Sequence, residues 1–195
     1  MHFKEIEFKY DAAGIEMAKF EELVEALPNI RKKMMVSSYD DYFTNTEGNF
    51  IRYRYHDGRG ELTIKRKVND KNNNERIEVN VPTAGDNLKT VTAFVDLLSY
   101  KHNFGIYKTC KIYWVDKVVV VYYVVYDKEL KELRRFIEIE ADEDLQWATE
   151  QEAWDEIAKY EKLFEPLGIT PKNRLRKSLF EIFRRGEKQP GTVAS

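Results

Sequence analysis

Apolar and polar residues alternate, or apolar residues run together, in eight segments of the chain, and both patterns are typical of β-strands. The segments are 3–10, 33–43, 49–56, 61–68, 75–82, 104–114, 117–127 and 134–141. Within the seventh, residues 118–126 are apolar throughout, which indicates a strand buried on both faces. DGRG at 57–60 and NDKNNN at 69–74 predict hairpin loops between three of the strands.

Four further segments predict helices. Apolar residues recur every three or four positions in 14–27 and 90–99, and helices are also expected at 146–165 and 174–185, on either side of a break at 168–171. Trp147 and Trp154 are seven residues apart, so they share a face that is expected to pack the third helix on the sheet. Strands and helices do not alternate as βαβ units, which argues against a dinucleotide-binding fold.

Length and composition narrow the class of protein. A chain of 195 residues with 43% hydrophobic residues fits one domain with a real core, and 32 basic against 34 acidic residues argue against a protein that coats nucleic acid. The single cysteine, Cys110, excludes an intrachain disulfide and a cysteine-based zinc site, and suits a reducing cytoplasm. The sequence shows no secretory signal and no transmembrane helix, and 186–195 is expected to be a disordered tail.

Charges are sorted between the strands. Because side chains alternate between the two faces of a strand, the first and last strands each carry carboxylates on one face. The middle strands carry basic residues on the corresponding face. For any single strand a solvated face is the commoner explanation, but sorting across five strands favours a closed barrel with a polar interior. Basic walls beside an acidic patch suit a polyphosphate with magnesium or manganese, because these metals prefer oxygen ligands.

Short motifs then resemble those of the CYTH superfamily, the triphosphate tunnel metalloenzymes, in the same order along the chain. Residues 5–9 (EIEFK) resemble the ExExK signature, and 136–140 (FIEIE) resemble the closing FxExE. Between them, 40–43, 50–54, 62–65, 76–78 and 106–114 resemble DxYF, LRxR, LTxK, RxE and VxKxRxxY. Asp127 matches an aspartate of the next strand, and 177–182 resemble the SYxEL end of the last helix. The resemblance covers 1–185, taken as one CYTH-like tunnel domain.

Three positions depart from the family pattern. Thr44 stands where the second aspartate of DxYFD is expected, and Ser99-Tyr100 replaces a Gly-Phe pair. The arginine of KxR falls on Cys110, and Lys67 or Lys111 could compensate for its loss. The departures at Cys110 and Thr44 are the feature that favours one alternative function, a protein that binds a nucleotide or polyphosphate without cleaving it.

The resemblance implies an α+β fold with an antiparallel closed β-barrel of about eight strands and helices packed outside. It also implies roles for named side chains, which fall into three groups. Expected to be catalytic are Glu7, Lys9, Glu78 and Asp127. Phosphate binding is expected of Lys9, Arg52, Arg54, Lys65, Lys67, Arg76 and Lys108. A patch for Mg²⁺ or Mn²⁺ is expected from Glu5, Glu7, Glu138 and Glu140.

The expected activity is metal-dependent hydrolysis of a triphosphate-bearing small molecule, such as inorganic triphosphate, thiamine triphosphate or a nucleoside triphosphate. The alternatives are a class IV-type adenylyl cyclase, a triphosphatase acting on RNA 5′ ends, and a protein that only binds a nucleotide or polyphosphate. No membrane partner is expected, and the family's frequent dimers suggest a homodimer.

Overall fold

The structure is a computed structural model that describes residues 3–69, 72–84 and 87–184, with side chains except those of 3–5, 65–69, 72–77 and 84. The expected tail at 186–195 lies outside the described residues, as do 70–71 in the NDKNNN segment. The strands are β1 (Phe3–Asp11), β2 (Ile30–Thr44), β3 (Phe50–His56), β4 (Arg59–Asn69), β5 (Asn72–Ala84), β6 (Lys101–Val115), β7 (Val118–Tyr126), β8 (Glu132–Ala141) and β9 (Arg174–Leu175). The α-helices are α1 (Met17–Glu25), α2 (Leu88–Leu97), α3 (Glu150–Leu163) and α4 (Leu179–Phe183).

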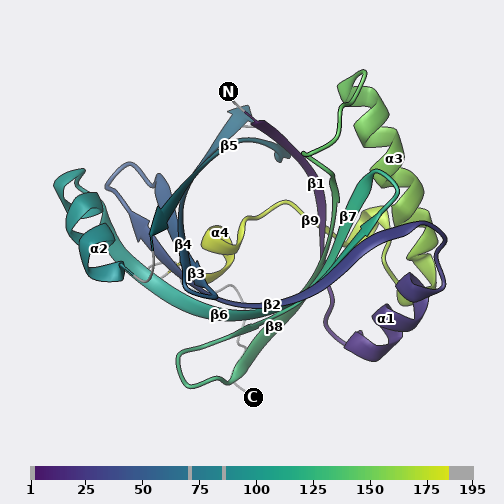
Figure 1. The fold of residues 1–195 in the computed structure, drawn as a ribbon, viewed down its shortest axis with the longest axis horizontal. Coiled ribbons are helices and arrows are strands. Elements are labelled where there is room, and N and C mark those ends of the chain that lie inside the picture. Colours follow the sequence, from purple (N-terminus) through teal and green to yellow (C-terminus); the bar gives the residue numbers. More distant parts are fainter. Residues whose placement is uncertain (1–2, 70–71, 85–86, 185–195) are drawn as a thin grey trace, which may run out of the picture.

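The strands form a closed antiparallel ring. Their order is β5-β4-β3-β2-β6-β7-β8-β1, with β9 on the far side of β1, and β1 also pairs with β5. The closing ladder joins Phe3 to Glu78 and Ile6 to Glu75. Figure 1 looks into this ring, and the expected α+β barrel of eight strands is confirmed.

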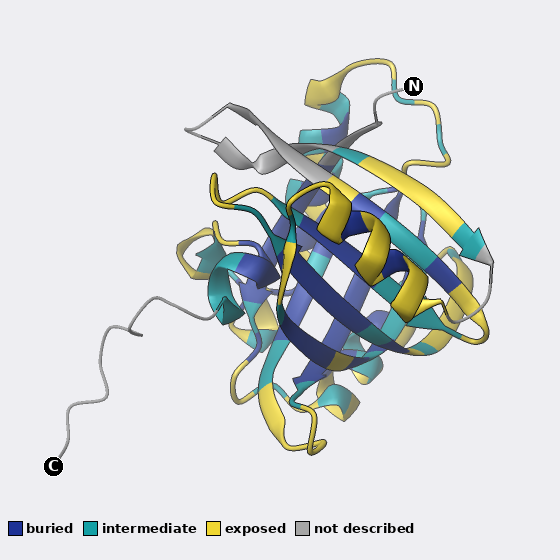
Figure 2. Ribbon diagram, turned by 90° about the vertical axis from the view of Figure 1, so that its left-hand side faces the viewer, coloured by how far each residue is buried: buried dark blue, intermediate teal, exposed yellow. Residues whose placement is uncertain are grey.

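Three helices pack on the outside of the ring, where alternate side chains of the strands are apolar. Residues of β1, β7 and β8 form one buried outer cluster with α1 and α3, in which the Phe8 ring lies 5.4 Å from that of Trp154. A smaller cluster lies under α2, where Val91 and Val95 pack against Phe43, Ile51 and Tyr53. Figure 1 shows α2 on one side of the barrel and α1 and α3 on the other. Figure 2, viewed from the α2 side, shows the buried strands beneath α2.

The last helix departs from the expected arrangement. One helix was expected over 174–185, but β9 first pairs with β1, and α4 begins only after Ser178. Ser178 and Glu181 form a capping box, which fixes the start of this short helix. The Phe180 ring stacks on that of Phe50 at 4.6 Å and joins the barrel's interior cluster, so α4 lies against the inner face rather than outside.

Candidate functional site

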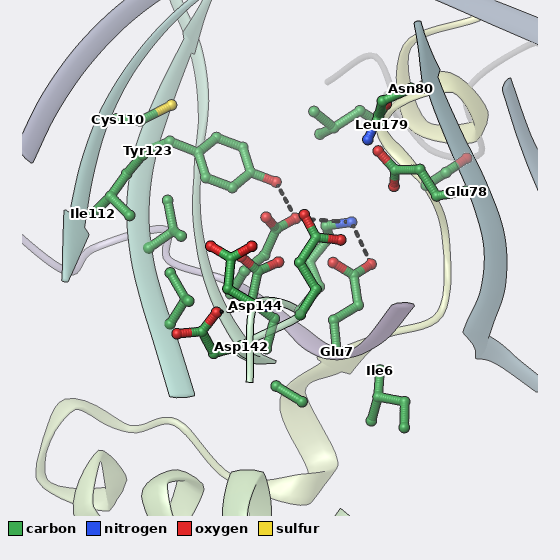
Figure 3. Close-up of a pocket in the computed structure, with 18 of the residues that line it drawn as sticks. Ile6, Glu7, Glu78, Asn80, Cys110, Ile112, Tyr123, Asp142, Asp144 and Leu179 are labelled. Carbon is green, nitrogen blue, oxygen red and sulfur yellow. Dashed lines mark hydrogen bonds and ion pairs between the residues drawn. The ribbon is translucent and has the colours of Figure 1, made fainter. Parts of the chain in front are cut away.

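The inward faces of the strands enclose a cavity of about 690 Å³. It extends from the charged centre of the barrel to the segment that precedes α3, and α4 contributes Leu179 and Phe180 to its wall. Figure 3 shows Glu7 and Tyr123 pointing into this space from different strands. The charged faces that the sequence sorts by sign therefore line one cavity.

Carboxylates gather where β1 and β8 run side by side. Glu7 lies directly opposite Glu140, and Lys9 lies opposite Glu138. Lys9 Nζ is 2.9 Å from Glu138 Oε1 and 3.3 Å from Glu7 Oε1. The Tyr123 hydroxyl donates to Glu138 Oε1 at 2.8 Å. Burial alone would raise the pKa of Glu138, but Lys9 and Tyr123 lower it to about 2, so this carboxylate is ionised at neutral pH.

Cations gather on β3 and β6 around one buried carboxylate. Asp40 on β2 is fully buried and accepts two hydrogen bonds from Arg54, at 2.8 and 3.0 Å. Lys108 Nζ lies 2.9 Å from Asp40 Oδ2, which also accepts one of the two Arg54 hydrogen bonds. Burial opposes ionisation of Asp40, but Arg54 and Lys108 hold its pKa well below the usual range. Burial and the nearby Arg54 lower the pKa of Lys108. The cluster carries more positive than negative charge.

Arg52 extends this basic sector toward β4 and β5. It donates to Thr63 Oγ1 at 2.8 Å and lies 3.7 Å from Glu78 Oε1. Thr63 in turn donates to Asn80 at 2.7 Å. The Nε donor of Arg52 is buried without a hydrogen-bond partner. A buried donor that lacks a partner is costly, so an anion in the cavity would satisfy it.

The expected site residues fall into three groups. Those that line the cavity are Glu7, Lys9, Arg52, Arg54, Glu78, Lys108, Glu138 and Glu140. The side chains of Glu5, Lys65, Lys67 and Arg76 lie outside the described part of the structure. Asp127 does not line the cavity. It lies in the turn between β7 and β8, where its carboxylate accepts the backbone N–H groups of Glu129 and Lys131, each at 2.9 Å.

The structure shows what surrounds two of the residues that depart from the family pattern, Thr44 and Cys110. Thr44 donates to the Asn49 carbonyl at 3.0 Å, so it holds the turn between β2 and β3. Cys110 is buried and faces the cavity, whereas Lys111 points outward and lies 2.8 Å from Glu21 of α1. Lys111 therefore does not replace the arginine that the family pattern places in the interior.

Sequence reasoning missed two residues that hold the others in place. Asp40 lies within the DxYF-like segment, but only the structure shows it between Arg54 and Lys108. Tyr123 lies in an apolar run with no signal of its own, yet its hydroxyl contacts Glu138. The alternation of β7 could have placed Tyr123 on the inward face, since Val121 and Val125 share that face.

The carboxylates where β1 and β8 run side by side are the type of ligand that a hard divalent cation prefers. Glu7, Glu138 and Glu140 offer oxygen ligands, and the like charges of Glu7 and Glu140 are directly opposed, which a cation would relieve. Among the side chains that the structure describes, no three histidines, cysteines, aspartates or glutamates already form a metal-holding group. Lys9 bridges Glu7 and Glu138, so a metal bound by both would have to displace its ammonium.

In the described part of the chain, no helix is both long and apolar enough to cross a membrane.

No protein-family profile matches the sequence, and no curated protein matches it. Solved structures do match. The PH1012 protein of Pyrococcus horikoshii has a TM-score of 0.72 at 19% identity, covering 92% of this chain and 99% of that one.

Two bacterial proteins, each described as a "putative adenylate cyclase", have the same fold. The one from Vibrio parahaemolyticus has a TM-score of 0.66 at 13% identity, over 93% of this chain and 98% of that one. The one from Bacillus halodurans has a TM-score of 0.61 at 15% identity, over 92% and 98%. At these identities the similarity shows the fold. The chain therefore shares its barrel fold with these proteins.

Proposed function

We propose that this protein is a divalent-metal-dependent triphosphatase that hydrolyses a triphosphate-bearing small molecule inside its barrel. The observation that carries the proposal is the division of one cavity into two charged sectors. Arg52, Arg54 and Lys108 line the basic sector, and Glu7, Glu138 and Glu140 line the acidic one. Buried cations bind phosphate oxygens strongly because little water competes for them.

Arg52, Arg54 and Lys108 would bind the phosphate chain and neutralise its charge. Lys9 lies between Glu7 and Glu138 in the cavity and would contact the terminal phosphate. Glu78 lies beside Arg52 and would orient a water for attack on the terminal phosphorus, with release of the remaining diphosphate. Phosphoryl transfer depends mostly on positioning and charge stabilisation, so a rigid barrel suits it. Asp127 has no part in this proposal.

Glu7, Glu138 and Glu140 would hold the Mg²⁺ or Mn²⁺ ion, and Glu5 is expected to join them. Bound there, the ion would supply Lewis-acid neutralisation of phosphate oxygens. The metal-ligand assignment rests on the all-oxygen donor set and on the opposed charges of Glu7 and Glu140.

Product analysis tests the proposal. The purified protein is incubated with ATP, thiamine triphosphate and inorganic triphosphate, each with magnesium or manganese, and the products are separated by chromatography. Release of phosphate that requires the metal is the expected result. Binding of these compounds without any product would contradict hydrolysis and favour a binding protein.

Cyclisation of ATP is the second candidate, because two proteins of the same fold are each described as a "putative adenylate cyclase". In that reaction the ribose 3′-hydroxyl attacks the α-phosphorus and pyrophosphate leaves. The same chromatogram separates the two reactions, since only a cyclase yields cyclic AMP and pyrophosphate from ATP.

A further inference from the structure

One wall of the cavity is apolar. Cys110, Ile112 and Trp114 of β6 lie opposite Tyr123, Val121 and Val119 of β7 in register. We name Cys110, Ile112, Trp114, Val119 and Val121 the apolar wall, and all five line the cavity. Figure 3 shows Cys110 and Ile112 on this side, together with Tyr123.

The cations of β6 end where this wall begins. Lys108 belongs to the basic sector, and the next two inward positions along the strand are Cys110 and Ile112. Lys111, the nearest cation along the strand, is ion-paired outside with Glu21. A phosphate group placed against the apolar wall would find no cation from β6, because the strand offers it only sulfur, aliphatic and indole groups. The exposed Lys32 of β2 reaches only the far end of the wall, where its Nζ lies 4.4 Å from the centre of the Trp114 ring.

Carboxylates border the same wall on its other side. Val121 lies opposite Glu138 and Val119 lies opposite Glu140 on β8. A second anionic group on the wall would therefore lie beside two carboxylates, which repel it. An organic group without negative charge meets no such repulsion, and it would cover apolar surface that the fold leaves open.

The wall is open enough to receive such a group. Ile112 and Trp114 are only partly buried, although they face the interior of a barrel. The cavity of about 690 Å³ lies within the range of about 300–1,000 Å³ that is typical of sites for small organic ligands. Covering partly exposed apolar side chains with a ligand is favourable, because apolar surface leaves water.

We infer that the apolar wall is the binding site for the organic part of a triphosphate ester, and that this protein prefers such esters to inorganic triphosphate. The inference rests on the proposed function, since it assumes that the basic sector binds the phosphates. An ester placed this way has its phosphates at Arg52, Arg54 and Lys108 and its organic group, which carries no negative charge, on Ile112 and Trp114.

A competition experiment tests the inference. A fluorescent N-methylanthraniloyl derivative of ATP is bound to the protein in EDTA, which withholds the metal needed for turnover. It is then displaced by ATP, by thiamine triphosphate or by inorganic triphosphate. We expect at least one of the two esters to compete at least tenfold more tightly than inorganic triphosphate. We expect Trp114→Ala to weaken that ester about tenfold and to leave the affinity for inorganic triphosphate unchanged.

Tyr107→Ala is the matched control. Tyr107 is a partly exposed aromatic residue of the same strand on its outer face, so its loss should leave both affinities unchanged. Two outcomes would overturn the inference and leave the triphosphatase proposal standing. In one, inorganic triphosphate competes as tightly as both esters. In the other, Trp114→Ala weakens inorganic triphosphate as much as it weakens the ester. If none of the four compounds binds, with or without magnesium, both proposals fail.

Discussion

Asp40 is the residue on which the basic sector depends. It is fully buried and neutralises part of the charge of Arg54 and Lys108. Asp40→Asn leaves both cations buried without that charge, and breaking a buried ion pair from one side costs about 3–5 kcal/mol. Urea unfolding at pH 7 should show a loss of this size. A loss below about 1 kcal/mol would mean that Asp40 does not hold the cluster together.

The difference in unfolding free energy between wild type and Asp40→Asn should depend on pH. The pKa of Asp40 is lowered in the folded protein, while in the unfolded chain it lies near about 3.9. Stability from its ionised form is therefore complete above about pH 4 and is lost as the pH falls toward the lower folded pKa. Urea unfolding of wild type and Asp40→Asn from pH 7 to pH 3 should give a constant gap down to about pH 4, which narrows below it. A constant gap down to pH 3 would contradict this.

Glu7 tests the acidic sector without disturbing the fold. Glu7→Gln loses the contact with Lys9 but also relieves the repulsion with Glu140, so we expect little change in the free energy of unfolding. Metal-dependent phosphate release should fall at least about 100-fold, as when one charge-stabilising group is removed from an active site. Glu47→Gln, an exposed loop substitution, is the control. Unchanged activity with unchanged metal dependence would refute the metal assignment.

Residue types and spacing predict most of the site, but not the contacts that organise it. The ExExK-like and LRxR-like segments place Glu7, Lys9, Arg52 and Arg54 on inward faces, and the structure agrees. Asp127 matched the family by order alone, and local geometry gives it a role in a turn. The role of Asp40 was not predicted, because an ion pair that joins β2, β3 and β6 depends on the register of these strands. No single segment of the sequence encodes that register.

Among the elements, α4 shows where local patterns stop being informative. The segment 174–185 has a helical pattern, yet Arg174 pairs with Glu161 at 2.5 Å, and β9 extends the sheet beside β1. These contacts come from distant parts of the chain and override local propensity. Only the segment after Ser178 has a capping residue at its start, and that is where the helix forms.

Phe180 should make α4 a stabilising element of the barrel. Its ring is buried and stacks on Phe50, with Tyr42 at 6.2 Å. Phe180→Ala removes this packing, and phenylalanine-to-alanine changes in cores cost about 3–5 kcal/mol. Phe94→Ala on α2 is the control, because Phe94 is 53% exposed and should cost far less. Similar losses of unfolding free energy in the two variants would show that α4 is only loosely attached.

At the scale of the molecule, the sorted charges predict the closed barrel because closure makes the acidic strands and the basic strands face one interior. The pairing of β1 with β5 and with β8 achieves this. What the charges do not predict is the apolar wall. Its residues belong to strands so apolar that their two faces look alike in the sequence, and only the register of β6 and β7 separates interior from exterior.

The whole barrel should be stabilised by a triphosphate, because the basic sector joins strands that are far apart in the chain and does not exist in the unfolded state. At a hundred times its Kd, a ligand that binds only the folded protein adds about 2.7 kcal/mol. For a chain of this length, that corresponds to a rise in Tm of about 5–11 °C. Calorimetry with inorganic triphosphate should show this rise, and sodium chloride at equal ionic strength should not. Arg52→Gln should lose most of the shift at the same ligand concentration. An equal shift in wild type and Arg52→Gln would place the triphosphate elsewhere on the molecule, since the Arg52 side chain extends from β3 into the cavity and lies 3.7 Å from Glu78.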